Sequence, residues 1–225
     1  MTIITVKTQD GLDVALNKYA EDSSATIIID STLGEWLTLW YTGLATVKVE
    51  GSSKVQVFGS STVEAHDSVT VRAFNSSMVV AFDSAIVQAY GSVLVEAHDI
   101  VTVAAHDSVT VRAYGSVTVE AYSNVTVAAY GTVTVRAYGS VAVRAYGSAM
   151  VWAHNSSTVL AYGTTNVQAY DSVKVAALDS TTVQASGTTT VEAYDTVTVR
   201  AYDSATVWSH DSSTVEADHS VKVSR

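Results

Sequence analysis

The sequence predicts an all-β protein, a two-sheeted β-solenoid (β-roll or β-helix) of 16-residue coils built from octapeptide repeats, with a small α+β cap at its N-terminus. Valine occupies every eighth position from Val47 to Val223. Around each valine, small apolar residues alternate with polar or aromatic ones, and a residue suited to tight turns follows four positions later. A short unbroken period is typical of a solenoid, in which each unit buries its apolar face only by stacking on its neighbours.

Each octapeptide combines a strand with a corner. Val69, Val71 and Ala73 alternate with Thr70 and Arg72, so the first three are expected to face a core and the other two the outside. Four residues after each valine of the eight-residue period, from Val47 to Val215, stands Gly, Asp, Asn, Ser or His, which indicates positive φ, and the next residue is nearly always Ser or Thr. Such hydroxyls can close a corner by bonding to local backbone.

The charged residues indicate two octapeptides per coil. Like charges on adjacent strands are destabilising, and three octapeptides per coil would place Glu96 over Glu120 and Arg112 over Arg136. Two octapeptides per coil align only opposite charges: Lys48 with Glu64, Glu96 with Arg112, Glu120 with Arg136, and Arg200 with Glu216. At about 4.8 Å between strands, roughly 11 such coils would form a rod on the order of 50 Å long.

The N-terminal region is less regular. We expect residues 1–44 to form a cap that shields the first strand edge, and residues 45–225 to form the solenoid. Four features carry this interpretation: strands at Thr2–Thr8 and Thr26–Asp30, a helix over Leu12–Ala20 after an Asp10-Gly11 turn, and Leu37, Leu39, Tyr41 and Gly43 in the frame of the later core and turn positions.

Composition excludes several functional classes. A formal net charge of −10 argues against direct nucleic-acid binding, which relies on cations that neutralise phosphates. The absence of cysteine excludes disulfides and thiolate chemistry within this sequence, and the absence of proline suits strand ladders that need every N–H group. No signal peptide and no apolar run of about 18 residues are seen, so we expect a cytoplasmic protein without a membrane span.

No motif indicates catalysis, a cofactor or a metal site, so we expect a protein that is not an enzyme. Five of the six histidines occupy an outward column that is held mostly by tyrosine or phenylalanine, where they are interpreted as exposed substitutes. Two rows of turn aspartates should stack and would repel unless they are solvated or neutralised by a cation such as calcium; solvation is the preferred interpretation. These rows are Asp67, Asp83 and Asp99, and Asp179, Asp195 and Asp211.

Two ladders on the outside and one edge are candidate interaction sites. Both ladders also suit strands for purely structural reasons, since Tyr and Thr favour sheets and stack well. The tyrosine ladder comprises Tyr114, Tyr130, Tyr146 and Tyr162, and the threonine ladder Thr102, Thr118 and Thr134. At the last coil, where no cap is visible, the candidate dimer edge comprises Val221, Lys222, Val223 and Arg225.

The tetrads Ala89–Ser92, Ala113–Ser116, Ala137–Ser140 and Ala145–Ser148 (Ala-Tyr-Gly-Ser) resemble the octapeptide repeats of bacterial ice-nucleation proteins. The resemblance spans residues 45–225 in period and turn chemistry, and it implies a β-solenoid with two octapeptides per coil that orders water. The family's Thr-x-Thr, with paired outward hydroxyls, is replaced here by Thr-Val-Arg, Thr-Val-Glu or Thr-Val-Ala.

Three functional interpretations follow. The first is a non-enzymatic, rigid β-solenoid that acts as a structural or protein-interaction module, with an unknown protein partner and a homodimer through its C-terminal coil. The alternatives are an ice-binding or ice-nucleation-like protein and an acidic solenoid that mimics DNA. Arg72, Arg112, Arg136, Arg144 and Arg200 would interrupt the negative stripe that such a mimic needs.

Overall fold

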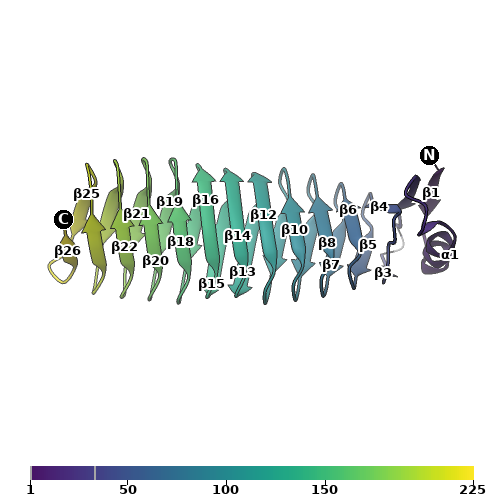
Figure 1. Cartoon of the computed structure of the whole chain (residues 1–225), viewed down its shortest axis with the longest axis horizontal. Coiled ribbons are helices and arrows are strands. Elements are labelled where there is room, and N and C mark those ends of the chain that lie inside the picture. Colours follow the sequence, from purple (N-terminus) through teal and green to yellow (C-terminus); the bar gives the residue numbers. More distant parts are fainter. Residues whose placement is uncertain (1, 33) are drawn as a thin grey trace. The chain divides into compact units, whose positions relative to one another are not determined.

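The computed structural model describes residues 2–32 and 34–225 and shows a two-sheeted parallel β-solenoid, which confirms the predicted fold class (Figure 1). The chain divides into two compact units, one ending at Val111 and the other beginning at Arg112. The division does not test the predicted boundary between residues 44 and 45, which stays a prediction.

The first unit contains two parallel sheets, and from β2 onward successive strands of the chain alternate between them. One sheet has the order β1 (Thr2–Val6), β2 (Ala25–Ile29), β4 (Thr46–Val49), β6 (Thr62–Ala65), β8 (Met78–Ala81) and β10 (Leu94–Ala97). The other has the order β3 (Trp36–Leu39), β5 (Lys54–Val57), β7 (Thr70–Ala73), β9 (Ile86–Ala89) and β11 (Thr102–Ala105).

The second unit repeats this arrangement. One sheet has the order β12 (Thr110–Gly115, which contains the division), β14 (Thr126–Gly131), β16 (Ala142–Gly147), β18 (Thr158–Ala161), β20 (Lys174–Ala177), β22 (Thr190–Ala193), β24 (Thr206–Ser209) and β26 (Lys222–Ser224). The other has the order β13 (Thr118–Ser123), β15 (Thr134–Gly139), β17 (Met150–Ala153), β19 (Asn166–Ala169), β21 (Thr182–Ala185), β23 (Thr198–Ala201) and β25 (Thr214–Ala217).

The register confirms that two octapeptides form one coil. In the second unit, for example, Val119 pairs with Val135. Three of the four opposite-charge pairs expected from the sequence lie within a single unit, and all three are formed. Their nitrogen–oxygen distances are 2.9 Å for Lys48–Glu64, 3.4 Å for Arg136–Glu120 and 2.9 Å for Arg200–Glu216.

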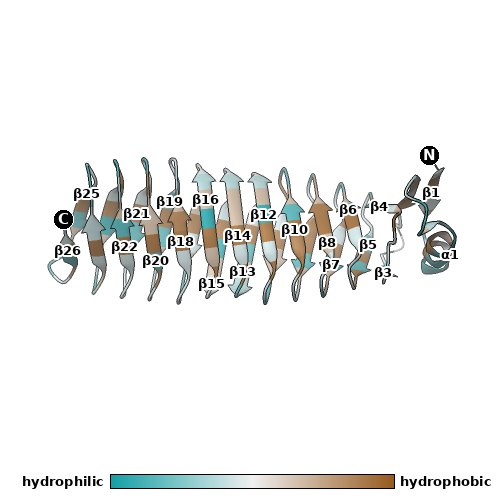
Figure 2. Cartoon of the chain, viewed as in Figure 1, coloured by the Kyte–Doolittle hydropathy of each residue, from teal (hydrophilic) through white to brown (hydrophobic). Residues whose placement is uncertain are grey.

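Valine and alanine fill the core, as the alternation predicts. The valines at every eighth position from Val47 to Val207 are all buried. In Figure 2, hydrophobic and hydrophilic bands alternate along the strands. The prediction was wrong for the last two valines, because Val215 is only half-buried and Val223 is 42% exposed. Val215 lies on β25 and Val223 on β26, the last strands of their sheets, and no described strand lies beyond either one.

The corner residues from Gly51 to Asp211 have positive φ, as predicted, whereas the prediction was wrong for His219, which does not. The corner aspartates have a role that the sequence did not indicate. The carboxylate of Asp67 accepts a hydrogen bond from the N–H of Gly51 at 2.9 Å, and that of Asp83 accepts one from the N–H of Asp67 at 3.0 Å. Asp99 bonds in the same way to the N–H of Asp83. The stacked carboxylates therefore bind the backbone of the preceding coil, which offsets their mutual repulsion.

The helix α1 (Gln9–Tyr19) lies between β1 and β2 in the chain and packs on both strands. Thr8 is its N-cap, and the Thr8 hydroxyl accepts a hydrogen bond from the N–H of Gly11 at 3.2 Å. Gly11 thus belongs to the first helical turn, so the expected Asp10-Gly11 turn before the helix was wrong. Leu12 and Ala15 are the buried residues of the helix.

The first coils are longer than two octapeptides, which shifts the frame that the sequence suggested. Trp36 pairs with Lys54 and not with a residue two octapeptides later, so Leu37 lies beside Val55 and Leu39 beside Val57. The expected frame had placed Leu39 in the valine column and Tyr41 in the alanine column. That prediction was wrong: Tyr41 follows the strand and is 55% exposed.

Candidate interaction surfaces

The four tyrosines of the predicted tyrosine ladder stack face to face along one edge of the second unit. The ring centroids of Tyr114 and Tyr130 lie 5.1 Å apart, and those of Tyr130 and Tyr146 lie 5.0 Å apart. Tyr162 continues the stack at 5.0 Å with an interplanar angle of 3°. Each ring is partly exposed, so the ladder presents a continuous row of aromatic edges that a partner can contact.

The predicted threonine ladder is shared between the units. Thr118 pairs directly with Thr134 in the second unit, whereas Thr102 belongs to the first unit and pairs with Ile86. The outward residue two positions after Thr118 and Thr134 is charged, and these neighbours, Glu120 and Arg136, form an ion pair. The hydroxyls of Thr118 and Thr134 therefore form a single column next to charged side chains. A Thr-x-Thr repeat would instead present two parallel columns of hydroxyls.

The candidate dimer edge belongs to a coil whose core residues are accessible to solvent: Val221 is only partly buried and Val223 is 42% exposed. Lys222 donates its N–H to the carbonyl of Ala205, the residue before β24. Because bonding direction alternates along a parallel strand, the N–H of Val223 points away from β24, toward the side where β26 has no neighbour. Arg225 lines a polar hollow of about 440 Å³ together with Ser209, His210, Asp211, Ser212 and Ser213.

Gln9, which the sequence did not single out, satisfies the backbone of an edge strand. Among the strands that the structure describes, β3 has a neighbour on one side, β5, and none on the other. On its other side, the Gln9 amide donates to the carbonyl of Thr38 at 3.0 Å and accepts the N–H of Thr38 at 2.6 Å. The side chain thus takes the place of a neighbouring strand at this residue. A glutamine early in a helix is too ordinary to signal this role.

Replacing Gln9 with alanine is expected to lower the free energy of unfolding by about 1 kcal/mol, since it removes two partly buried hydrogen bonds. Amide hydrogen exchange at Thr38 should become faster in the same variant. The matched control is Val14→Ala, at a position on the same helix that is 68% exposed, and it should change neither quantity. Unchanged exchange at Thr38 in the Gln9 variant would count against this role.

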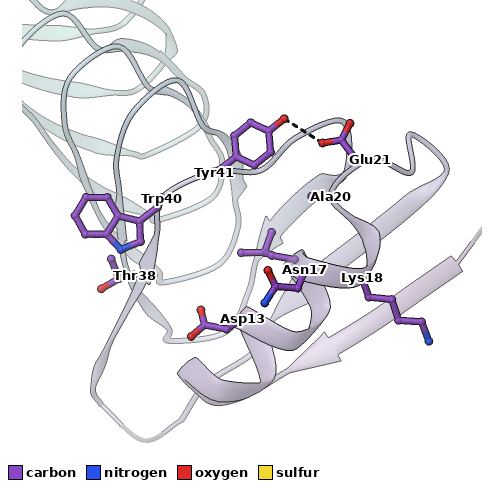
Figure 3. A pocket seen from close by; sticks show the side chains of 9 residues that line it. Asp13, Asn17, Lys18, Ala20, Glu21, Thr38, Trp40 and Tyr41 are labelled. Carbon is purple, nitrogen blue, oxygen red and sulfur yellow. Dashed lines mark hydrogen bonds between the residues drawn. The ribbon is translucent and has the colours of Figure 1, made fainter.

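A second feature outside the predicted set is a pocket of about 490 Å³ beside α1 (Figure 3). Its lining includes Trp40 and Tyr41, which are 68% and 55% exposed, and the carboxylates of Asp13 and Glu21. The Tyr41 hydroxyl donates a hydrogen bond to Glu21 at 3.3 Å. The negative charge of Glu21 and this bond raise the pKa of Tyr41 above its ordinary value, so the phenol is neutral at physiological pH.

The described residues contain no group of three or more His, Asp or Glu side chains arranged to hold a metal ion. Within residues 2–32 and 34–225, no helix has the length and apolar character needed to cross a membrane. Comparisons with family models, curated proteins and solved structures found no match. The β-solenoid is therefore established by the structure alone, and the ice-nucleation resemblance rests on the repeat sequence.

Proposed function

We propose that this chain is a non-enzymatic, rigid β-solenoid that acts as a structural and interaction module and self-associates through its C-terminal coil. The observation that carries the proposal is the exposure of core positions at β25 and β26. Val215 and Val223 continue the column that is buried from Val47 to Val207, yet both contact solvent. Covering them recovers hydrophobic free energy, and pairing the free edge of β26 satisfies its outward N–H groups.

The charges of the C-terminal coil favour a second copy as the occupant. Lys222 and Arg225 bring two cations to the same coil as Glu216 and Asp218. A two-fold contact places each surface against itself, so a patch that carries both signs can be complementary to its own copy. Such a contact pairs the free edge of β26 in one copy with the same edge in the other, so the assembly stops at two chains.

Light scattering on the full chain tests this proposal. At high micromolar concentration the expected mass is twice that of the single chain, which is 23.7 kDa. Val223→Pro removes an outward N–H and is expected to yield the monomer, whereas Val223→Thr retains that N–H and a β-branched side chain and is expected to dimerise. Melting curves for all three proteins establish that each is folded. A monomeric unmodified chain, or a dimer that survives the proline, would overturn the proposal.

An ice-binding function is the second candidate, favoured by a regular column of hydroxyls. Thr182 pairs with Thr198, and Thr198 with Thr214, on adjacent strands of one sheet. Thermal hysteresis and droplet-freezing assays on the unmodified chain test this function directly. If the chain is inactive in both assays, the ice-binding function is ruled out. A DNA mimic is the weaker alternative, because the Arg136–Glu120 and Arg200–Glu216 pairs place cations within the acidic surface.

A further inference from the structure

We propose that the pocket beside α1 binds an organic cation, a guanidinium or alkylammonium group, between Trp40 and the carboxylate of Asp13. At about 490 Å³ the pocket has the size of sites for small ligands and single side chains. This proposal uses residues of the first unit and does not depend on self-association through the C-terminal coil.

Trp40 supplies an aromatic platform. Its indole stacks on Phe58 with ring centroids 4.3 Å apart and an interplanar angle of 18°. Phe58 stacks in turn on Phe74 at 4.7 Å, so Trp40 begins a row of rings. A stacked neighbour covers one face of the indole, while Trp40 as a whole remains 68% exposed. The uncovered face of this ring carries negative electrostatic potential, which attracts cations.

The charges around the pocket favour a cation over an anion. Asp13 and Glu21 are both lining residues. Lys18, the cationic residue of the lining, has its ammonium group 4.9 Å from the centroid of the Tyr19 ring, and Figure 3 shows it pointing away from Trp40 and Asp13. The Asp13 carboxylate accepts one hydrogen bond, from the Gln9 amide at 2.8 Å, and retains further acceptor capacity.

The same strand region already holds a guanidinium against an indole. The Arg72 guanidinium lies over the Trp36 ring, 4.2 Å from its centroid. Trp36 stands at the start of β3 and Trp40 directly after its end. Trp36 therefore has its cation within the chain, whereas the open face of Trp40, with Asp13 nearby, matches a cation supplied from outside.

Calorimetric or NMR titration of the full chain tests the proposal with three probes. Ethylguanidinium represents a free cation, the capped pentapeptide Gly-Gly-Arg-Gly-Gly represents a side chain of another protein, and the same peptide with citrulline in place of arginine is the neutral control. We expect saturable binding of at least one cationic probe, with a Kd on the order of 1 mM, and none of the neutral control. Tighter binding of the arginine peptide than of ethylguanidinium would identify a protein side chain as the source, and equal binding a free cation.

Two substitutions test whether the cation binds in this pocket. Trp40→Leu should weaken binding about tenfold, and Asp13→Asn, which still accepts the bond from Gln9, should weaken it severalfold. Lys18→Gln is the matched control on the same helix and should not weaken binding. Melting curves establish that the variants are folded. Equal binding of the citrulline peptide, no saturable binding of either cation, or full affinity in the Trp40 variant would each overturn the proposal.

Discussion

Val119→Asp is expected to lower the free energy of unfolding by about 4 kcal/mol or more and to unfold the coils around β13 before the rest of the second unit. Val119 is fully buried and pairs with Val135 on the neighbouring strand. A carboxylate at this position has no partner in an interior of valine and alanine. Because repeat proteins owe their stability to contacts between neighbouring coils, a lesion in one coil also weakens the coils beside it.

Thermal and urea unfolding followed by circular dichroism measure this effect. The control is Thr118→Asp, which introduces the same carboxylate one residue earlier, on the outward face. It should change stability by about 0.5 kcal/mol or less, the range usual for surface substitutions. Equal effects of the two substitutions would contradict the assignment of Val119 to the core.

Gly43→Ala is expected to cost about 3 kcal/mol or more and to disturb the packing of α1. Gly43 has a φ of +61°, where an L side chain is strained. A Cβ built at Gly43 would overlap the backbone carbonyl of Ala20. That carbonyl accepts the N–H groups of Leu44 and Ala45, so it holds the end of α1 to the segment before β4.

Gly34→Ala is the control that separates the cost of a positive φ from the cost of steric overlap with neighbouring atoms. Gly34 has a φ of +73°, yet a Cβ there would meet no atom within 4 Å. This control should therefore cost only about 1 kcal/mol, the penalty of the backbone conformation itself. Unfolding curves of the two variants, with NMR shifts of the α1 amides, make the comparison. A Gly43 variant as stable as the Gly34 variant would contradict the close packing described at Ala20.

The regular part of the fold was predictable because each octapeptide repeats the same physical requirements. The valine period located the core, the turn residues located the corners, and the charges selected two octapeptides per coil over three. Lys48 and Glu64 illustrate the last point, since only the shorter coil brings them together, at 2.9 Å. In the second unit, the stack of Tyr114 to Tyr162 followed from the same periodicity.

The N-terminal region was less predictable because it departs from the period. Extending the frame back to Leu39 assumed a constant coil length, but two residues are added between β3 and β5. The role of Gln9 and the exposure of Trp40 arise from how α1 meets this longer coil, and local sequence does not encode that contact. Val215 and Val223 show a different limit: a repeat pattern marks which residues suit a core, but burial also requires a coil on both sides.

The distance between two copies of one labelled residue tests self-association most directly. The chain has no cysteine, so a single spin label can be attached at Ser224→Cys, on β26, or at Ser116→Cys, in the corner before β13 of the same unit. Double electron–electron resonance on the two proteins then reports distances between chains. We predict a short, narrow distance distribution for the label at residue 224 and a much longer one, or none, for the label at residue 116. No coupling at residue 224, or a short distance at residue 116 alone, would contradict an interaction module that assembles through its C-terminal coil.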